Sequence, residues 1–329
     1  MKVPLISIII PVYNVEAYIA RCARSLYEQT YPHIEYIWVN DATSDNSIQI
    51  LKRITDEYPQ RKADVRIVEH SRNKGLPTAR NTGLSVAVGD YVFHCDSDDW
   101  VNKDMIELFC EEVARTDADI VYSDWYLTFS KSERYMVQPT LQTSLECIEA
   151  MLSGTMRFNV WNKMVRRSLY VDSDISFPNG NGMGEDMTMI KLFASARKVS
   201  YLPKAFYHYM QVNPHAFTKV YSKEHWKQLY CNIADIKLFI QQKYGCLFQT
   251  QLHFFCLNVK LPLLITGDKH SYEHWLCCFP ESNKYINQNR LISARIRWLQ
   301  QMALKRRFWL VRIHYYMLIK LVYGIIYRQ

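Results

Sequence analysis

The chain has 329 residues, of which 49% are apolar and 22% are charged, and it carries a net charge of +8. This composition excludes disorder along the whole chain, and nine scattered cysteines without a CxxC pair support neither a disulfide framework nor a zinc site. Residues 282–329 hold ten Lys or Arg and no acidic residue, so residues 1–281 sum to −2, which disfavours nucleic acid as a partner.

The first hundred residues alternate apolar runs with helical patterns. The strands predicted from this pattern are 5–12, 34–40, 64–70 and 90–95, and the helices between them are at about 15–29, 45–58 and 77–88. The first apolar run is short and broken by prolines, so we expect a first strand and not a signal peptide. Strands that alternate with helices indicate an α/β fold with a mostly parallel sheet flanked by helices.

Each of the four predicted strands ends in a polar turn. The turns are PVYN (11–14), NDATSDN (40–46), SRNKG (71–75) and DSDD (96–99). In open α/β sheets, ligands bind in the crevice outside the carboxyl ends of the strands. The four turns therefore predict one ligand site at this edge of the sheet.

The remainder of the chain begins with a predicted helix around 103–116 and a strand at 120–129. A mixed region follows, in which a helix opens at GED (184–186) after a loop rich in Gly and Asn. After about residue 220 the pattern is wholly helical. We predict a domain over 1–220, with a nucleotide-binding half (1–100) and an acceptor half (101–220), and a helical C-terminal region over 221–329.

The DSDD turn crowds three carboxylates, Asp96, Asp98 and Asp99, which repel one another unless a cation is bound. A turn or capping role explains one of them but not all three. We expect Mn²⁺ or Mg²⁺, held by one or two carboxylates together with phosphate oxygens of a substrate. A phosphatase with an aspartate nucleophile also uses Asp-x-Asp after a strand. Trp100, and the segment TGDKHS (266–271) without a second carboxylate, fit that class poorly.

Five segments, in chain order, point to one family. They are PVYNVEAYIARCARSLYEQTY, IEYIWVNDATSDNS, NKGLPTARNTGL, GDYVFHCDSDDW and GMGEDMTM. Over roughly residues 4–220, this set resembles the family 2 glycosyltransferases, which are inverting, nucleotide-sugar-dependent enzymes with the GT-A fold. One such segment alone is a weak signal, but five in order at suitable spacings are specific.

The resemblance implies roles on the nucleotide side. Pro11 and Tyr13 match residues that frame the nucleobase, and Asp41 matches a carboxylate that accepts a hydrogen bond from uracil. Asn40 and Ala42 depart from the Asp and Gly that are more usual in the family, while the second acid stays in place.

The resemblance also assigns the phosphate side. Arg80 resembles an arginine that faces the nucleotide pyrophosphate, and a surface ion pair on a helix is the alternative. Asp98 is the expected metal ligand, and Asp96 is expected at the metal as well, near the nucleotide ribose or a metal-bound water. Asp99 has no settled role.

On the acceptor side, inverting transfer needs a base for the acceptor hydroxyl. Asp186 is the expected base, and Glu185 positions the acceptor or acts in its place; an ordinary acidic helix start is the alternative. Trp161 either stacks on a sugar or belongs to the core. His208 and His215 are candidates for a place near the metal, with a structural role as the alternative for each.

The basic tail, residues 290–329, is predicted to be amphipathic. Apolar residues recur at helical spacing over 290–303, and the stretch 308–327 carries charged side chains that disfavour a span across a bilayer. We expect the tail to lie on a membrane surface with its cations toward anionic headgroups, and packing against protein is the alternative. The enzyme would then be cytoplasmic and peripheral on the inner face of the cell membrane.

The predicted function is metal-dependent, inverting transfer of a sugar from a nucleotide-sugar to a hydroxyl of a glycan or lipid-linked saccharide, in polysaccharide or glycolipid biosynthesis. A UDP-sugar is the expected donor. The chain has no QxxRW motif, which disfavours a processive synthase. The alternatives are the metal-dependent phosphatase and a catalytically silent nucleotide-binding protein.

Overall fold

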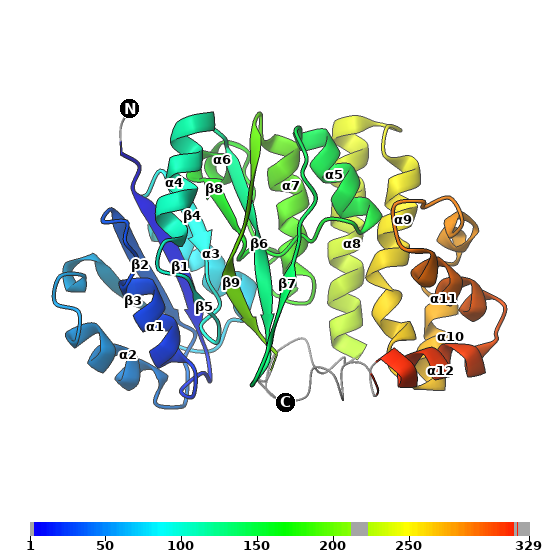
Figure 1. Cartoon of the computed structure of the whole chain (residues 1–329), viewed down its shortest axis with the longest axis horizontal. Helices are drawn as coiled ribbons and strands as arrows, with labels where there is room; N and C mark the ends of the chain where they lie inside the picture. Colours follow the sequence, from blue (N-terminus) through cyan, green and yellow to red (C-terminus); the bar gives the residue numbers. More distant parts are fainter. Residues whose placement is uncertain (1–2, 212–222, 319–320, 322–329) are drawn as a thin grey trace. The chain divides into compact units, whose positions relative to one another are not determined.

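The computed structural model describes residues 3–211, 223–318 and 321. These residues belong to two compact units, which we call the sheet unit (1–128, 133–145 and 158–236) and the helical unit (129–132, 146–157 and 237–329). Figure 1 shows the elements of both, coloured along the chain. The domain boundary predicted near residue 220 stays a prediction.

The sheet unit contains all of the described strands. They are β1 (Ile6–Val12), β2 (Ile34–Asn40), β3 (Val65–Glu69), β4 (Tyr91–His94), β5 (Trp100–Val101), β6 (Ile120–Thr128), β7 (Glu133–Met136), β8 (Lys163–Arg166) and β9 (Val199–Met210). Its helices are α1 (Ile19–Tyr27), α2 (Ser47–Asp56), α3 (Leu76–Val86), α4 (Met105–Thr116), α6 (Arg167–Asp172) and α7 (Thr188–Ser195), with short 3-10 turns at η1 (Lys62–Asp64) and η2 (Glu185–Met187).

The helical unit contains α9 (Gln249–Val259), α10 (Lys269–Cys277), α11 (Ala294–Leu304) and α12 (Phe308–Tyr315), with the 3-10 turns η4 (Leu261–Leu264) and η5 (Pro280–Tyr285). Two further helices, α5 (Ser144–Ser153) and α8 (Lys223–Tyr244), begin in the sheet unit and end in the helical unit. The prediction of a wholly helical pattern after about residue 220 is confirmed for the residues that the structure describes.

The described strands form one sheet in the order β3-β2-β1-β4-β8-β6-β9-β5, with β7 beside β6. The pairs within β3-β2-β1-β4 are parallel, as is the pair β6 and β9. β8 lies between β4 and β6 and is antiparallel to both. The predicted α/β class is confirmed, but the sheet is parallel mainly in its first half, because β8 enters it in the opposite direction.

The predicted strands agree with the observed ones to within one residue, whereas the first helix is shorter than predicted. It begins at Ile19 and not near residue 15, because the preceding residues are tied to the turn after β2. Three backbone N–H groups donate to that turn: Asn14 N to Thr43 Oγ1 (2.8 Å), Val15 N to Ser47 Oγ (3.1 Å) and Glu16 N to Asp45 Oδ2 (2.9 Å). The first two polar turns are therefore held together at one edge of the sheet.

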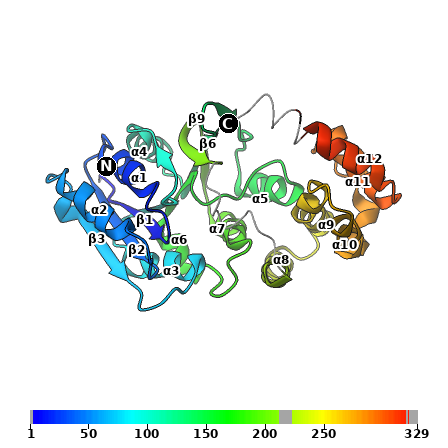
Figure 2. The same ribbon diagram turned by 90° about the horizontal axis from the view of Figure 1, so that it is seen from below.

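Helices cover both faces of the parallel strands. Figure 2 shows α1 and α4 on one face and α3 on the other. Every residue of β1 is buried, which is the pattern of a strand covered on both faces. α3 approaches β1 closely at Gly83, where a Cβ atom would lie 2.3 Å from Ile9 Cγ2. This close approach places Arg80, about one helical turn earlier, near the ends of the strands.

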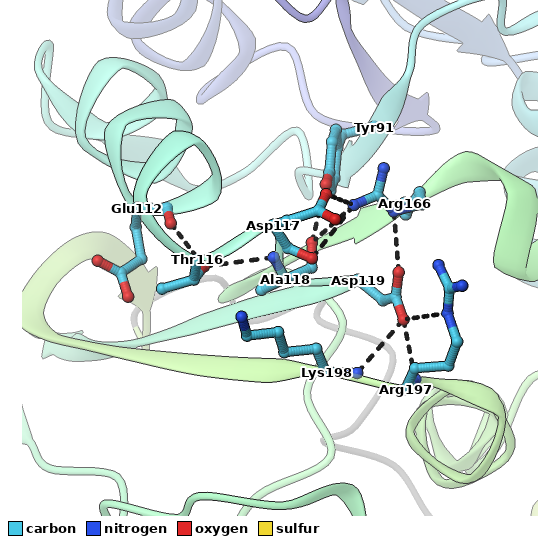
Figure 3. A network of polar contacts seen from close by, with 9 residues as sticks. All are labelled: Tyr91, Glu112, Thr116, Asp117, Ala118, Asp119, Arg166, Arg197 and Lys198. Carbon is cyan, nitrogen blue, oxygen red and sulfur yellow. Dashed lines mark hydrogen bonds and ion pairs between the residues drawn. The ribbon is translucent and has the colours of Figure 1, made fainter. Parts of the chain in front are cut away.

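A buried carboxylate fixes the antiparallel part of the sheet (Figure 3). Asp119 precedes β6, and its Oδ1 accepts from Arg166 Nε (2.9 Å) at the end of β8. Its Oδ2 accepts from the backbone N–H of Arg197 (2.8 Å), just before β9. Arg166 also donates to Asp117 Oδ1 (2.6 Å) and lies 4.9 Å from the ring centroid of Tyr91 in β4. These contacts join β4, β6, β8 and β9, and they hold β8 between its neighbours.

The core of the helical unit contains one buried lysine. Lys260 Nζ donates to the carbonyl oxygens of Trp275 (3.2 Å) and Cys278 (2.7 Å) and to Asn283 Oδ1 (2.6 Å). Its three N–H groups therefore have three acceptors, which offsets the cost of removing the ammonium from water. Burial lowers the pKa of Lys260 to about 8.

Candidate functional site

The strand ends of the sheet unit carry the acidic residues that the sequence predicts for the site. Asp41 follows β2, and the DSDD turn follows β4. Glu185 and Asp186 lie in η2, directly before α7. Arg80, from α3, connects the DSDD turn to η2.

Arg80 is the centre of a buried ion-pair cluster. Its Nη2 donates to Asp96 Oδ1 (2.8 Å) and its Nε to Glu185 Oε1 (3.3 Å). The residue is 1% exposed. Burial by itself opposes the charge, but the carboxylates of Glu185 and Asp96 raise the pKa of Arg80 above its usual value. The alternative of a surface ion pair is therefore wrong, because Arg80 joins the DSDD turn to the GED segment inside the protein.

Two polar atoms of this cluster lack partners. Among the described residues, Arg80 Nη1 and Glu185 Oε2 are buried without a hydrogen-bond partner. Most buried polar groups in native structures are paired, so each such atom calls for an explanation. A donor and an acceptor thus remain for a polar ligand beside Asp96.

Asp41 is buried in the turn after β2, where the turn after β3 contacts it. Its Oδ1 accepts from His70 Nδ1 (2.7 Å) and from the backbone N–H of Lys74 (2.8 Å). Its Oδ2 accepts from the backbone N–H of Gly75 (2.8 Å). Because a carboxylate oxygen can accept two hydrogen bonds, Oδ2 keeps one position for a further donor.

The residues expected to frame the base lie at the same edge of the sheet. Pro11 is buried in β1, and Tyr13 is 46% exposed in the turn that follows. Ala42 has a φ of 55°, in the left-handed region that favours glycine, at a cost of about 1 kcal/mol. This backbone conformation explains why glycine is the more usual residue at this position in the family that the sequence resembles. Asn40, the other departure, accepts from Thr43 N (2.9 Å) and closes the turn.

The aspartates of the DSDD turn have different surroundings. Asp96 and Asp98 are partly exposed, whereas Asp99 is fully buried. Asp99 Oδ1 accepts from Met210 N (2.7 Å), and Oδ2 accepts from the Tyr207 hydroxyl (2.7 Å). Burial, together with the charges of Asp98 and Asp96, raises the pKa of Asp99 well above its usual value. Asp99 is therefore an internal residue of the turn.

The donor set at the DSDD turn fits a hard divalent cation. Over residues 3–211, 223–318 and 321, no group of three or more His, Cys, Asp or Glu is arranged to hold a metal alone. Asp96 and Asp98 offer carboxylate oxygens, the ligands that Mg²⁺ and Mn²⁺ prefer. Two such residues suit a cation whose other ligands come from substrate phosphates. His215 lies outside the described residues.

Glu185 and Asp186 differ in what they can reach. Burial raises the pKa of Asp186 to about 6, against the attraction of Arg80 and Lys163. Burial raises the pKa of Glu185 to about 8, although Arg80 opposes the shift. Glu185 is buried and bound to Arg80, whereas Asp186 is partly exposed. Asp186 is therefore the carboxylate of the pair that a ligand can contact.

The loop before this acid pair is anchored. Gly184 has a φ of 81° at the start of η2, a conformation that glycine adopts without strain. The backbone N–H of Met183 donates to Gln228 Oε1 (3.1 Å), and Asn232 Nδ2 donates to the Met183 carbonyl oxygen (2.9 Å). Both side chains come from α8, so this helix sets the position at which η2 begins.

The sugar-stacking role considered for Trp161 is wrong. Its ring is buried and stacks on Tyr207, with 4.5 Å between ring centroids, and on Tyr209, at 5.1 Å. Trp161 is therefore a core residue, the alternative that the sequence left open.

His208 is a structural residue and not a metal ligand. Its ring stacks on Trp100 (3.4 Å between centroids) and on Tyr126 (4.7 Å). Both ring nitrogens are occupied, Nδ1 with Glu133 Oε1 (2.6 Å) and Nε2 with Asn102 Oδ1 (2.8 Å). No ring nitrogen is left for a cation.

Two residues of the site were not predicted from the sequence. His70 supports Asp41, and Tyr207 contacts both the backbone of Asp96 and the carboxylate of Asp99. His70 is the last residue of a predicted strand, directly before a polar turn, and this position was a usable signal. Tyr207 directly precedes the candidate His208, and nothing in the local sequence distinguishes it from a core tyrosine.

Comparison with known proteins identifies the family. Residues 7–172 match the family model described as Glycosyl transferase family 2. The chain is 30% identical over 301 residues to a Bacillus subtilis protein described as the uncharacterized glycosyltransferase EpsJ. That match covers 87% of this chain and 82% of the relative.

Solved structures share the fold. TarS of S. aureus (residues 1–349, in complex with UDP-GlcNAc) matches with a TM-score of 0.69 and 19% identity, over 95% of this chain and 91% of that one. The mannosyltransferase PcManGT of Pyrobaculum calidifontis, in complex with GDP-Man and Mn²⁺, matches with a TM-score of 0.53 and 15% identity, over 94% and 88%. The predicted GT-A-like fold is confirmed. By its sequence match and its relative, the chain belongs to glycosyl transferase family 2 and is a glycosyltransferase.

Proposed function

We propose that this glycosyltransferase moves a sugar from a UDP-sugar to a hydroxyl of a glycan or lipid-linked saccharide, with inversion and with a bound divalent cation. The Arg80 cluster is the observation that carries the proposal. Its guanidinium joins Asp96, on the expected donor side, to Glu185, next to the expected base. The residues proposed to bind the donor and those proposed to act on the acceptor are thereby held close together.

A uridine nucleotide is supported by the hydrogen bonding of Asp41. The remaining acceptor position on Oδ2 suits the N3–H of uracil, and Pro11 and Tyr13 lie at the same edge of the sheet. The UDP-GlcNAc complex of TarS, which has the same fold, supports the same nucleotide.

On the phosphate side, Asp98 would hold Mn²⁺ or Mg²⁺ together with diphosphate oxygens, and Asp96 would lie next to it. The Mn²⁺ complex of PcManGT supports a cation in this fold. When bound, the cation neutralises charge that develops on the leaving diphosphate. Arg80 adds a second positive charge, and its unpaired Nη1 can donate to a phosphate oxygen.

On the acceptor side, Asp186 takes the proton of the acceptor hydroxyl. As that proton leaves, the hydroxyl oxygen bonds to the anomeric carbon from the face opposite the diphosphate, and the bond to the diphosphate breaks to release UDP. A pKa of about 6 leaves Asp186 deprotonated at neutral pH and still basic enough to receive the proton. Glu185, fixed by Arg80, orients η2 and with it Asp186.

A donor panel tests the proposal. Purified enzyme with UDP-, GDP- and dTDP-sugars should release nucleotide fastest from a UDP-sugar, and the turnover should disappear with EDTA and return with Mn²⁺ or Mg²⁺. Asp98→Asn should raise the metal concentration for half-maximal activity by about tenfold or more, because one charged ligand is lost. Turnover that persists in EDTA would contradict the metal, and a preference for GDP-sugars would contradict uridine.

The basic tail, residues 290–329, is the basis for a proposed location of the enzyme in the cell. The apolar face expected over 290–303 is largely inside the helical unit, since Leu299, Met302 and Ala303 of α11 are buried. α12 and the turn after it instead expose one apolar stripe at helical spacing: Trp309 (63% exposed), Ile313 (48%), Tyr316 (46%) and Met317 (60%). None of the helices in the described part of the chain has the length and apolarity that crossing a bilayer requires.

We propose that this α12 stripe rests on the inner face of the cell membrane. Arg312 lies beside the stripe, with its guanidinium 5.7 Å from the centroid of the Tyr316 ring, and Lys305, Arg306 and Arg307 are exposed directly before α12. Residues 282–329 contain no acidic residue, so this stretch carries an excess of positive charge that suits anionic headgroups. Apolar and aromatic side chains beside exposed cations are the composition of an interfacial helix.

Vesicle sedimentation tests the membrane contact. The full chain should bind vesicles with anionic lipid and bind neutral vesicles more weakly, and added salt should reduce the binding. The double variant Trp309→Ser, Ile313→Ser should bind about tenfold more weakly, because two inserted side chains are lost. Leu247→Ser, at a site 61% exposed elsewhere in the helical unit, is the matched control. Equal binding by the double variant and wild type would contradict the contact.

A further inference from the structure

We propose that Tyr207 and Asp99 are positioning residues that hold the backbone of Asp96 where the donor binds. The inference rests on the proposed donor role of Asp96 and Asp98. It adds a hydrogen-bonded link, from β9 to the DSDD turn, that acts through Asp96 and does not touch the substrate.

The link is a continuous chain of short hydrogen bonds. The Tyr207 hydroxyl accepts from the backbone N–H of Asp96 (3.0 Å) and donates to Asp99 Oδ2 (2.7 Å). Asp99 Oδ1 accepts from the backbone N–H of Met210 (2.7 Å), at the end of β9. Asp99 N also donates to the Asp96 carbonyl oxygen (3.1 Å), which closes the turn on itself. The turn is therefore connected twice to one strand.

Packing alone does not account for these two polar groups. The Tyr207 ring is already fixed by stacking on Trp161, so a phenylalanine would fill the same place. Asp99 is fully buried, and a carboxylate in that position costs free energy unless it is hydrogen-bonded. Burying a hydroxyl and a carboxylate together is reasonable where their hydrogen bonds fix a geometry.

Tyr207 and Asp99 together fix the conformation of Asp96. Its backbone is held by Tyr207, and its side chain is held by Arg80 (2.8 Å). With both ends constrained, the carboxylate of Asp96 has one orientation before any ligand arrives. Asp98, two residues on, shares the same turn, so the position of the proposed metal ligand depends on the same link. Pre-organised ligands of this kind bind more tightly because less freedom is lost on binding.

Tyr207→Phe tests the link, since it removes the hydroxyl and keeps the ring. We expect UDP and Mn²⁺ to bind about tenfold more weakly, by calorimetry for UDP and by electron paramagnetic resonance for Mn²⁺. The KM for the donor should rise by a similar factor, with kcat at saturation within about threefold of wild type. Amide hydrogen exchange in the DSDD turn should become faster without any ligand, because the Asp96 N–H loses its acceptor.

Two further variants separate this role from general destabilisation. Tyr201→Phe removes a hydroxyl that donates to Asp124 Oδ1 (2.8 Å) from the same strand, and it should leave UDP and Mn²⁺ binding unchanged. Asp99→Asn should weaken binding as Tyr207→Phe does, and the double variant should be little worse than either, because both residues act through one chain.

The outcomes distinguish the inference from the proposed function. Absence of UDP and Mn²⁺ binding in the wild type would contradict the proposed function and this inference with it. If the wild type binds UDP and Mn²⁺, and Tyr207→Phe binds them as tightly as Tyr201→Phe does, this inference alone would be overturned. Fully additive losses in the double variant would also overturn it, because independent effects exclude a single link.

Discussion

Asp186→Asn should lower kcat about a thousandfold, because the asparagine keeps the shape of the side chain and cannot accept the proton of the acceptor hydroxyl. UDP affinity should change less than about threefold, since Asp186 lies on the acceptor side and Arg80 holds Asp96 independently of it. Steady-state kinetics with a saturating donor, together with calorimetry of UDP binding, separates these two effects.

The pH dependence gives the same prediction a second measurement. The base works deprotonated, and burial raises the pKa of Asp186 to about 6. The wild-type kcat/KM should therefore fall about tenfold for each pH unit below about 6, and the residual activity of Asp186→Asn should lack this limb. Asp172→Asn, at an exposed position on α6, is the matched control and should behave as wild type. A kcat for Asp186→Asn within tenfold of wild type would place the base elsewhere, with Glu185 the next candidate.

Arg80→Met should reduce the free energy of unfolding by about 3–5 kcal/mol, because it removes the guanidinium that binds Asp96 and Glu185 and leaves both side chains without that partner in a buried cluster. Urea denaturation, followed by far-UV circular dichroism, measures this loss. Adding Glu185→Gln to Arg80→Met should restore part of the stability, since the second variant removes the ionisable group that is the more deeply buried of the two left without a partner.

The chain offers a matched control for this prediction. Arg24 and Glu57 form an ion pair of 2.6 Å in which the two side chains are 41% and 44% exposed. Arg24→Met should cost less than about 1 kcal/mol, because water screens the pair and solvates the remaining charge. If Arg80→Met costs no more than Arg24→Met, the Arg80 cluster does not contribute to stability as we describe.

Features with a local cause were predictable from the sequence. The five predicted strands agree with β1, β2, β3, β4 and β6 to within one residue because apolar runs and polar turns alternate sharply there, as at Val12 to Asn14 and at His94 to Asp96. The acidic residues of the site were recognisable as motifs, since each follows a strand or opens a helix. Local pattern therefore supplied the candidates and their place at the edge of the sheet.

Features that depend on distant pairing were not predictable. Arg80 and Glu185 are 105 residues apart, and Asp99 and Tyr207 are 108 apart, so no local pattern connects them. The same limit explains why the sequence left two roles open for Trp161 and for His208, because a local pattern does not distinguish a ring that stacks on other rings from a ring that contacts a ligand. For α11, the helical spacing indicated an apolar face, but it did not indicate that other residues of the helical unit cover this face.

The place of β8 in the sheet has a consequence for how the enzyme is made. β4 is synthesised early, but one of its edges pairs with β8, which follows about seventy residues later. The backbone N–H of Asp96 donates to the Tyr207 hydroxyl, which is 111 residues further along the chain. A nascent chain that ends near residue 100 has an open strand edge and an unsupported DSDD turn. We therefore do not expect residues 1–100 to fold first as a separate module, and we expect them to gain their final form only after β9 has left the ribosome.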